Sequence, residues 1–130
     1  MSWSSARAAL DARWNLFPGV SDTNTAWPNR PFPVDPLSII PDTHYRIHFL
    51  PATVNPELQG ADHEKGIYQV SVFVKAGGGI GPALVKAQAI VDHFKRQNLS
   101  GTACGVPIIA SPLQESDWWH VPVSIPFQVL

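Results

Sequence analysis

A strand, a glycine-rich loop and a helix follow one another directly, and this unit is the best candidate for ligand chemistry. Residues 66–75 have strand chemistry, Gly77–Gly81 form the loop, and Pro82 opens a helix expected to run to about Gln97. Such a unit can hold a phosphate, because glycines let backbone N–H groups approach an anion at a helix N-terminus. The same unit also serves as scaffolding in assembly proteins, so the two interpretations predict different functions.

The residues that follow the glycine loop argue against a nucleotide site. A phosphate-binding P-loop needs Lys followed by Ser or Thr at the helix start, whereas Gly81 is followed by Pro82, Ala83 and Leu84. The glycines also recur at every second position, which does not fit the dinucleotide pattern G-x-G-x-x-G. Proline in the first helical turn is a common structural start signal. We therefore interpret the loop as a connection and keep a small nucleotide-binding enzyme as the less favoured alternative.

Histidine, cysteine and acidic residues form no convincing catalytic or metal site. His44 and His48 share one strand face but lie about 13 Å apart along an extended chain. A third metal ligand would have to come from one of the remaining histidines, at positions 63, 93 and 120, and none has a known ligand spacing. Nothing in the local sequence places a base beside Cys104. The acidic residues at 57, 62, 64, 115 and 117 are typical of solvated loops. The sequence thus offers no convincing active site, and we expect no cofactor and no bound metal.

Composition limits the class of protein further. The 130 residues are 45% apolar and 15% charged, which predicts a single globular domain over residues 1–130. The net charge is -1 and no basic cluster is present, so binding to nucleic acid or to an anionic membrane is not expected. A single cysteine excludes an intramolecular disulfide. With neither a signal peptide nor a run of about 20 apolar residues, we expect a soluble protein that is intracellular when made.

Apolar periodicity predicts two helices and four main strands. The helix periods cover residues 3–17 and 82–97, and strand patterns cover 43–50, 67–75, 106–112 and 118–130. Pro122 and Pro126 make continuous pairing along both edges of the last strand unlikely, so we expect part of it at a sheet edge. The order of elements predicts an α+β fold, with an antiparallel sheet of about four strands and two helices packed on one face.

Residues 18–43 form a proline-rich segment, which we call the arm. Six prolines lie between Phe17 and Asp42, so the arm is expected to be extended, with a short edge strand near Ala26–Trp27. Wide aromatic rings beside prolines or polar residues are typical of contact surfaces. On this basis we predict a subunit or partner interface formed by Trp27, Pro28, Arg30, Phe32, Trp118 and Trp119.

Nearly the full chain resembles the tail terminator proteins of long-tailed bacteriophages. The resemblance is carried, in order, by residues 27–32 (WPNRPF), 45–51 (YRIHFLP), 66–73 (GIYQVSVF), 76–79 (AGGG), 89–96 (AIVDHFKR) and 121–127 (VPVSIPF). Each segment alone is weakly specific. GIYQV and VPVSIPF together are fairly specific.

The resemblance implies a non-enzymatic virion protein that forms a ring, typically of six copies, at the head-proximal end of the tail tube. Such a ring ends tube polymerisation and joins the tail to the head, so the implied partners are the tail tube protein and a head-completion or connector protein. DNA would pass through the lumen without sequence-specific binding, and assembly would take place in the host cytoplasm. A head-completion or other neck protein is the alternative within the same class.

Overall fold

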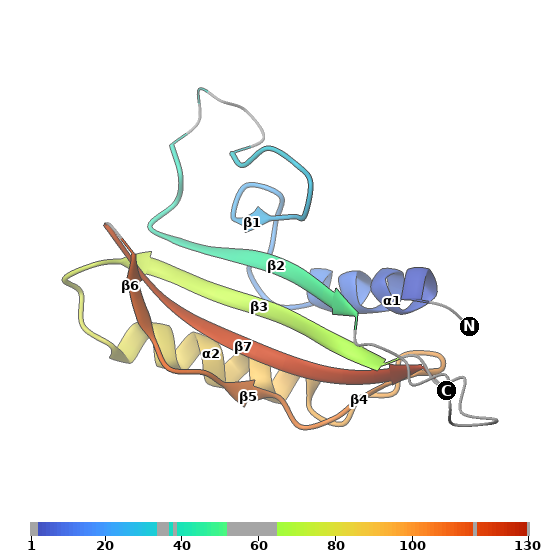
Figure 1. The fold of residues 1–130 in the computed structure, drawn as a ribbon. Coiled ribbons are helices and arrows are strands. Elements are labelled where there is room, and N and C mark those ends of the chain that lie inside the picture. The colour runs from blue at the N-terminus through green and yellow to red at the C-terminus, as the bar shows by residue number, and fades with distance from the viewer. Residues whose placement is uncertain (1–2, 34–36, 38, 52–64, 116, 130) are drawn as a thin grey trace.

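Three long antiparallel strands form the centre of the sheet (Figure 1). They are β2 (Thr43–Pro51), β3 (Lys65–Lys75) and β7 (Trp118–Val129) in the computed structural model, which describes residues 3–33, 37, 39–51, 65–115 and 117–129. Strand β3 lies in the middle, with Val70 opposite Ile47 on one side and Val123 on the other. All three strands were expected from their alternating residues, and their bounds agree to within two residues.

Short strands complete the sheet at both sides. Strand β1 (Thr25–Ala26) pairs in parallel with β2, while β4 (Thr102–Cys104), β5 (Ile108–Ile109) and β6 (Leu113–Glu115) all pair with the outer edge of β7. The described residues therefore form a mixed sheet of seven strands. The α+β class is confirmed, but the expected antiparallel sheet of about four strands is wrong in number and in the direction of β1.

The two prolines of β7 lie at the breaks between these short strands. Along the outer edge, residues 118–120 pair with β6, residues 123–124 with β5 and residues 127–129 with β4. In the gaps, the carbonyls of Pro122 and Pro126 accept hydrogen bonds from the backbone N–H groups of Ala110 and Gly105. Proline lacks an N–H donor, so regular pairing stops where it stands. Pairing is interrupted as expected, although β7 is an inner strand rather than an edge strand.

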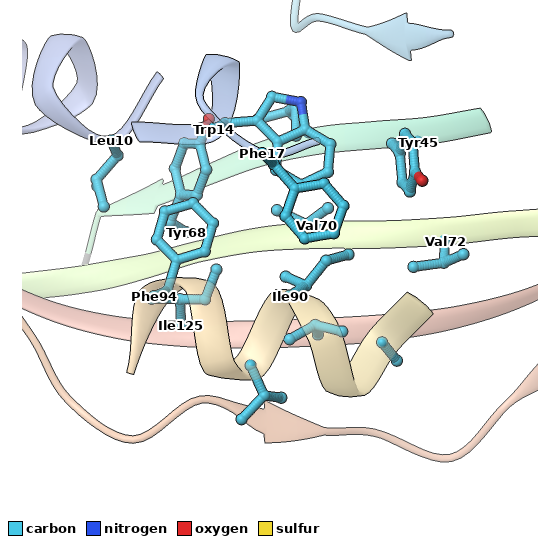
Figure 2. Close-up of a cluster of buried hydrophobic side chains, with 14 of the residues drawn as sticks. Leu10, Trp14, Phe17, Tyr45, Tyr68, Val70, Val72, Ile90, Phe94 and Ile125 are labelled. Atoms are coloured by element: carbon cyan, nitrogen blue, oxygen red, sulfur yellow. The ribbon is translucent and has the colours of Figure 1, made fainter. Parts of the chain in front are cut away.

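Both helices cover the same face of the sheet. Helix α1 (Trp3–Asn15) and helix α2 (Gly81–Phe94) meet over Tyr68, whose hydroxyl donates to Asp11 of α1 and whose ring lies 5.9 Å from that of Phe94 in α2. Figure 2 shows the large buried side chains between the helices and the strands. The core is built from the apolar stripe of each helix and from alternate strand residues, including Leu10, Trp14, Tyr45, Val70, Val72, Ile90, Val123 and Ile125.

Reciprocal hydrogen bonds join the ends of the two helices. The guanidinium of Arg13 donates to the carbonyl oxygen of His93 through Nε (3.0 Å) and Nη2 (2.8 Å). His93 donates in return through Nε2 to the carbonyl oxygen of Arg13 at 2.7 Å, since a carbonyl can only accept. Trp14 also donates through Nε1 to the hydroxyl of Thr25 (3.3 Å), which ties α1 to β1.

Two predicted segments are described only in part. Residues 52–64, which include His63 and three of the acidic residues assigned to solvated loops, lie outside the described residues. The same holds for residues 34–36 and 38 of the arm, so its extended form stays a prediction. No helix in the described part of the chain is long and apolar enough to span a membrane.

We expect Gly66→Ala to destabilise the protein by about 1–3 kcal/mol, because an added methyl group would be crowded by the two strands that flank β3. A Cβ at Gly66 would lie 2.7 Å from the carbonyl oxygen of Leu50 and 2.7 Å from the ring of Phe127. Urea unfolding measures the loss. Gly81→Ala is the matched control, since a Cβ there meets nothing within 4 Å. Equal stability of Gly66→Ala and the wild type would contradict this packing.

We expect Tyr68→Phe to cost about 1–3 kcal/mol near pH 7, because it removes a donor to a half-buried carboxylate. The Tyr68 hydroxyl lies 2.6 Å from Asp11, whose pKa is raised by burial and lowered in part by this bond and by Arg7. The cost should shrink as the pH falls and Asp11 takes up a proton. Thermal unfolding from pH 7 to pH 3 tests this, with Tyr45→Phe as the control that removes a buried hydroxyl elsewhere. A cost that does not change with pH would show that Asp11 is not the acceptor that matters.

Candidate functional site

The face of the sheet opposite the helices carries histidine, aromatic and polar side chains in transverse rows. One row places His44 of β2 beside Phe73 of β3 and His120 of β7. The next row places Arg46 beside Ser71. These residues alternate with the core residues of the same strands, so they point away from the helices. We call this surface the open face.

Aromatic rings gather at the end of the open face where β2 begins. The His44 ring is stacked on that of Phe73, with centroids 4.9 Å apart and planes 8° apart. Phe32 of the arm lies 5.4 Å from His44, and Trp118 meets it edge-on at 4.6 Å. These rings line part of a cavity of about 520 Å³, which Ile40 of the arm also borders. The arm is therefore anchored to the sheet at this end.

Burial lowers the pKa of two histidines of the open face, His44 and His48. It lowers the pKa of His44, and the nearby Arg46 guanidinium lowers it further. His44 donates through Nδ1 to the carbonyl oxygen of Pro41 at 3.2 Å, which sets the position of its proton. The pKa of His48 is lowered by the same two causes. His120 lies edge-on to Phe73 at 4.7 Å, with its Nδ1 3.6 Å from a carboxylate oxygen of Glu115.

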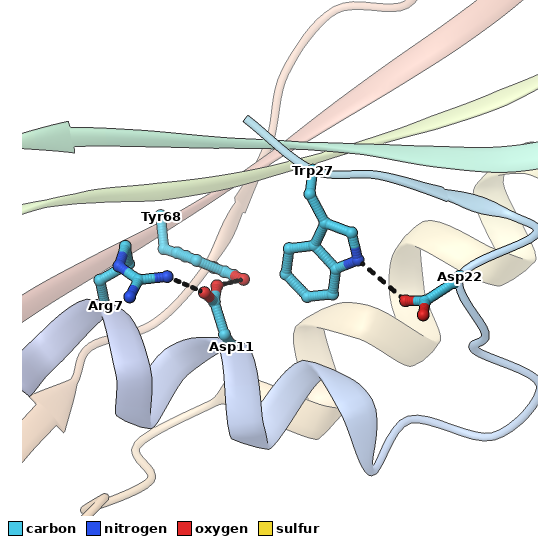
Figure 3. Close-up of polar contacts among 5 residues, drawn as sticks. All are labelled: Arg7, Asp11, Asp22, Trp27 and Tyr68. Carbon is cyan, nitrogen blue, oxygen red and sulfur yellow. Dashed lines mark hydrogen bonds and ion pairs between the residues drawn. The ribbon is translucent and has the colours of Figure 1, made fainter. Parts of the chain in front are cut away.

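A second hollow lies between α1 and the chain that leaves β1 (Figure 3). Trp27, Pro28 and Arg30 line it, and its volume is about 440 Å³. Trp27 donates through Nε1 to Asp22 at 3.4 Å and packs against the core on its inner side. Across the hollow, Arg7 and Asp11 of α1 form an ion pair at 2.8 Å. Acidic and basic groups are balanced here, so the hollow does not select a ligand of one charge.

The six predicted interface residues fall into three places. Trp27, Pro28 and Arg30 share the hollow beside α1, whereas Phe32 and Trp118 meet His44 on the open face. Trp119 follows Trp118 in the alternating strand pattern, so it points to the opposite face. There, on the helix side of the sheet, it packs against the core. All six are exposed or half-buried. Their role as an interface stays a prediction.

The glycine loop has a local structural reason. Gly77 and Gly79 have φ angles of 94° and 83°, in the left-handed region that favours glycine, so they allow the chain to turn from β3 into α2. Helix α2 then starts with Pro82 in its first turn and has no side-chain cap. Burial raises the pKa of Cys104 to about 11, which keeps this thiol protonated. Among the described residues, no group of three or more His, Cys, Asp or Glu side chains could hold a metal ion.

Sequence reasoning missed several residues of the open face. Phe73 alternates with Val72 and Val74, so the sequence places it on the polar face of its strand. An aromatic residue on that face could have indicated a contact surface there. Arg46 follows the same phase as His44 and His48, and its guanidinium carbon lies 5.9 Å from the centre of the Phe73 ring. The pairing of His120 with Phe73 depends on the register between β3 and β7, which no local pattern reveals.

Both the sequence and the fold are similar to those of known proteins. Residues 5–127 match the phage tail terminator protein family. A solved structure that carries only a sequence identifier as its name has a TM-score of 0.72, with 23% identity, over 100% of this chain and 96% of that chain. This likeness concerns the fold alone. No curated protein matches the sequence significantly.

The match spans almost the whole chain, including both helices and the three long strands, so it is not due to one motif. It also covers the segments on which the resemblance to tail terminators rests. The chain therefore belongs to the phage tail terminator protein family.

Proposed function

We propose that six copies of this chain form a ring at the head-proximal end of a phage tail tube. The ring ends polymerisation of the tube and presents the surface that joins the tail to the head. Membership of the terminator family supports the proposal, because it implies a structural, non-enzymatic role in the virion tail. The ring, its copy number and its position go beyond what family membership shows.

The exposure of large apolar side chains in the arm is the observation that supports ring formation. Leu37 and Ile39 are each 92% exposed. Such exposure is unfavourable in a monomer and is relieved when another chain covers the side chains. The arm is also rich in proline, and a rigid segment loses little entropy when it docks.

A closed ring needs two different surfaces on each copy. In such a heterologous interface one patch contacts a different patch on the neighbour, and the rotation between copies closes on itself. The arm supplies one projecting surface. The tail tube protein and a head-completion or connector protein are the further partners, and each would contact one rim of the ring. DNA would pass through the lumen without sequence-specific contacts, in keeping with a net charge of -1. Assembly would take place in the host cytoplasm.

We expect the purified protein to form particles of about 85 kDa, six times the 14.2 kDa chain. Light scattering coupled to gel filtration measures the mass, and negative-stain images should show a central hole. Replacing Leu37 and Ile39 together by Ser should lower the mass. Val85→Ser is the matched control, since Val85 is 70% exposed and belongs to α2 rather than to the arm. A monomer at every concentration, both alone and with tube protein, would contradict the ring.

Disruption of the gene in its phage should give tails of abnormal length and heads that lack joined tails, because nothing then stops the tube. Electron microscopy of lysates measures the tail lengths. A plasmid copy of the wild-type gene should restore normal tails, whereas the Leu37 and Ile39 double variant should not. Tails of uniform, normal length without attached heads would instead indicate a head-completion or neck protein.

A further inference from the structure

An apolar patch crosses the open face at the end where β2 finishes. Leu50 of β2 lies opposite Ile67 of β3, which lies opposite Pro126 of β7, so the three side chains form one transverse row. Gly105 donates to the carbonyl oxygen of Pro126, which brings Val106 beside the row, and Ile108 pairs with Ser124 in the next row. We call Leu50, Ile67, Val106, Ile108 and Pro126 the distal patch.

Within the described part of the chain, the apolar side chains of the distal patch stay partly exposed. Leu50, Ile67, Val106 and Ile108 are between 39% and 65% exposed. The neighbouring row contributes His48, Gln69 and Ser124, none of which is an acid. A contiguous apolar surface of this kind, with a polar border, marks a site of protein contact.

Leu37 and Ile39 of the same chain do not cover this patch, since each is 92% exposed. Thr43 and Leu50 are seven residues apart on β2, which separates them by about 23 Å. Ile39 precedes Thr43 by four residues, so it reaches back no more than about 14 Å even if fully extended. Figure 1 shows the chain that leads into β2 at one end of the sheet and the finish of β2 at the other. Phe32 also holds the arm against His44 at the first end.

We propose that Leu37 and Ile39 of one copy cover the distal patch of the next copy around the ring. The contact joins two apolar surfaces that lie at opposite ends of each chain, which is the arrangement a heterologous interface requires. The two surfaces have borders of opposite charge. Lys65 lies on the same strand face as Ile67 in the distal patch, and Asp42 lies three residues after Ile39 in the arm. The inference rests on the proposed ring and names its contact.

The helix side of the molecule offers a rival surface. Leu16 after α1 and Val85 on α2 are each 70% exposed, and Val85 borders a hollow between the two helices. Lys86 and Asp92 border the same hollow, so its rim carries charges of both signs. The uncharged distal patch suits the uncharged pair Leu37 and Ile39 better. The rival surface supplies the control positions.

Crosslinking between introduced cysteines tests the contact. The variant carries Ile39→Cys and Ile67→Cys in a Cys104→Ala background and is treated with a short bismaleimide. We expect a ladder of linked chains up to the hexamer on a denaturing gel. Each cysteine alone should give no ladder beyond a dimer. The control pair Ile39→Cys and Val85→Cys should give monomers. A ladder from the control pair and none from the test pair would overturn the proposal in favour of the helix side.

The particle mass of single variants is a second test, and it also serves when a cysteine variant assembles poorly. Ile67→Glu should shift the particle from about 85 kDa to the monomer mass, while Val85→Glu should leave it assembled, and thermal unfolding shows whether each variant is folded. A folded Ile67→Glu protein that still forms the full ring would also overturn the proposal. The ring itself is judged on the wild type: a wild-type ring without the predicted crosslink rejects this contact alone, whereas a wild-type monomer rejects the ring.

Discussion

The burial of Tyr68 between two helices is the interaction on which the rest of the structure depends. Its ring lies against Phe94 of α2 and its hydroxyl bonds to Asp11 of α1, so one side chain of the central strand positions both helices. The bonds between Arg13 and His93 then fix the helices to each other. Because Tyr68 points to one face only, both helices must lie there.

This one-sided packing determines what the other face can do. A sheet covered on one face presents the alternate residues of every strand to its surroundings. Here they divide into a histidine and aromatic end, where the arm is anchored, and an apolar end, where β2 and β7 finish and β3 begins. The two ends differ in chemistry although they belong to the same three strands. Each chain therefore has two surfaces of different chemistry, which is what a heterologous contact between identical chains uses.

Local periodicity accounts for the part of the fold that could be predicted. The three long strands and both helices have unbroken patterns, and the alternation also places Trp119 with Val121 on the helix side. Strands β4 and β6 were missed because three residues carry too little pattern, and every residue of β6 is exposed. These short strands are stabilised by pairing with the outer edge of β7. The parallel pairing of β1 and the row from His44 to His120 depend on contacts between distant segments, so no window of sequence reveals them.

The broken outer edge of the sheet has a consequence for a protein that exposes apolar side chains. Identical copies at high concentration tend to join strand to strand and grow into fibrils when a long, regular edge is available. The outer strands β4, β5 and β6 are only two or three residues long, and prolines in β7 keep them apart. No template of useful length is present at that edge. The chain can thus expose apolar surface elsewhere with little risk of amyloid growth from this edge.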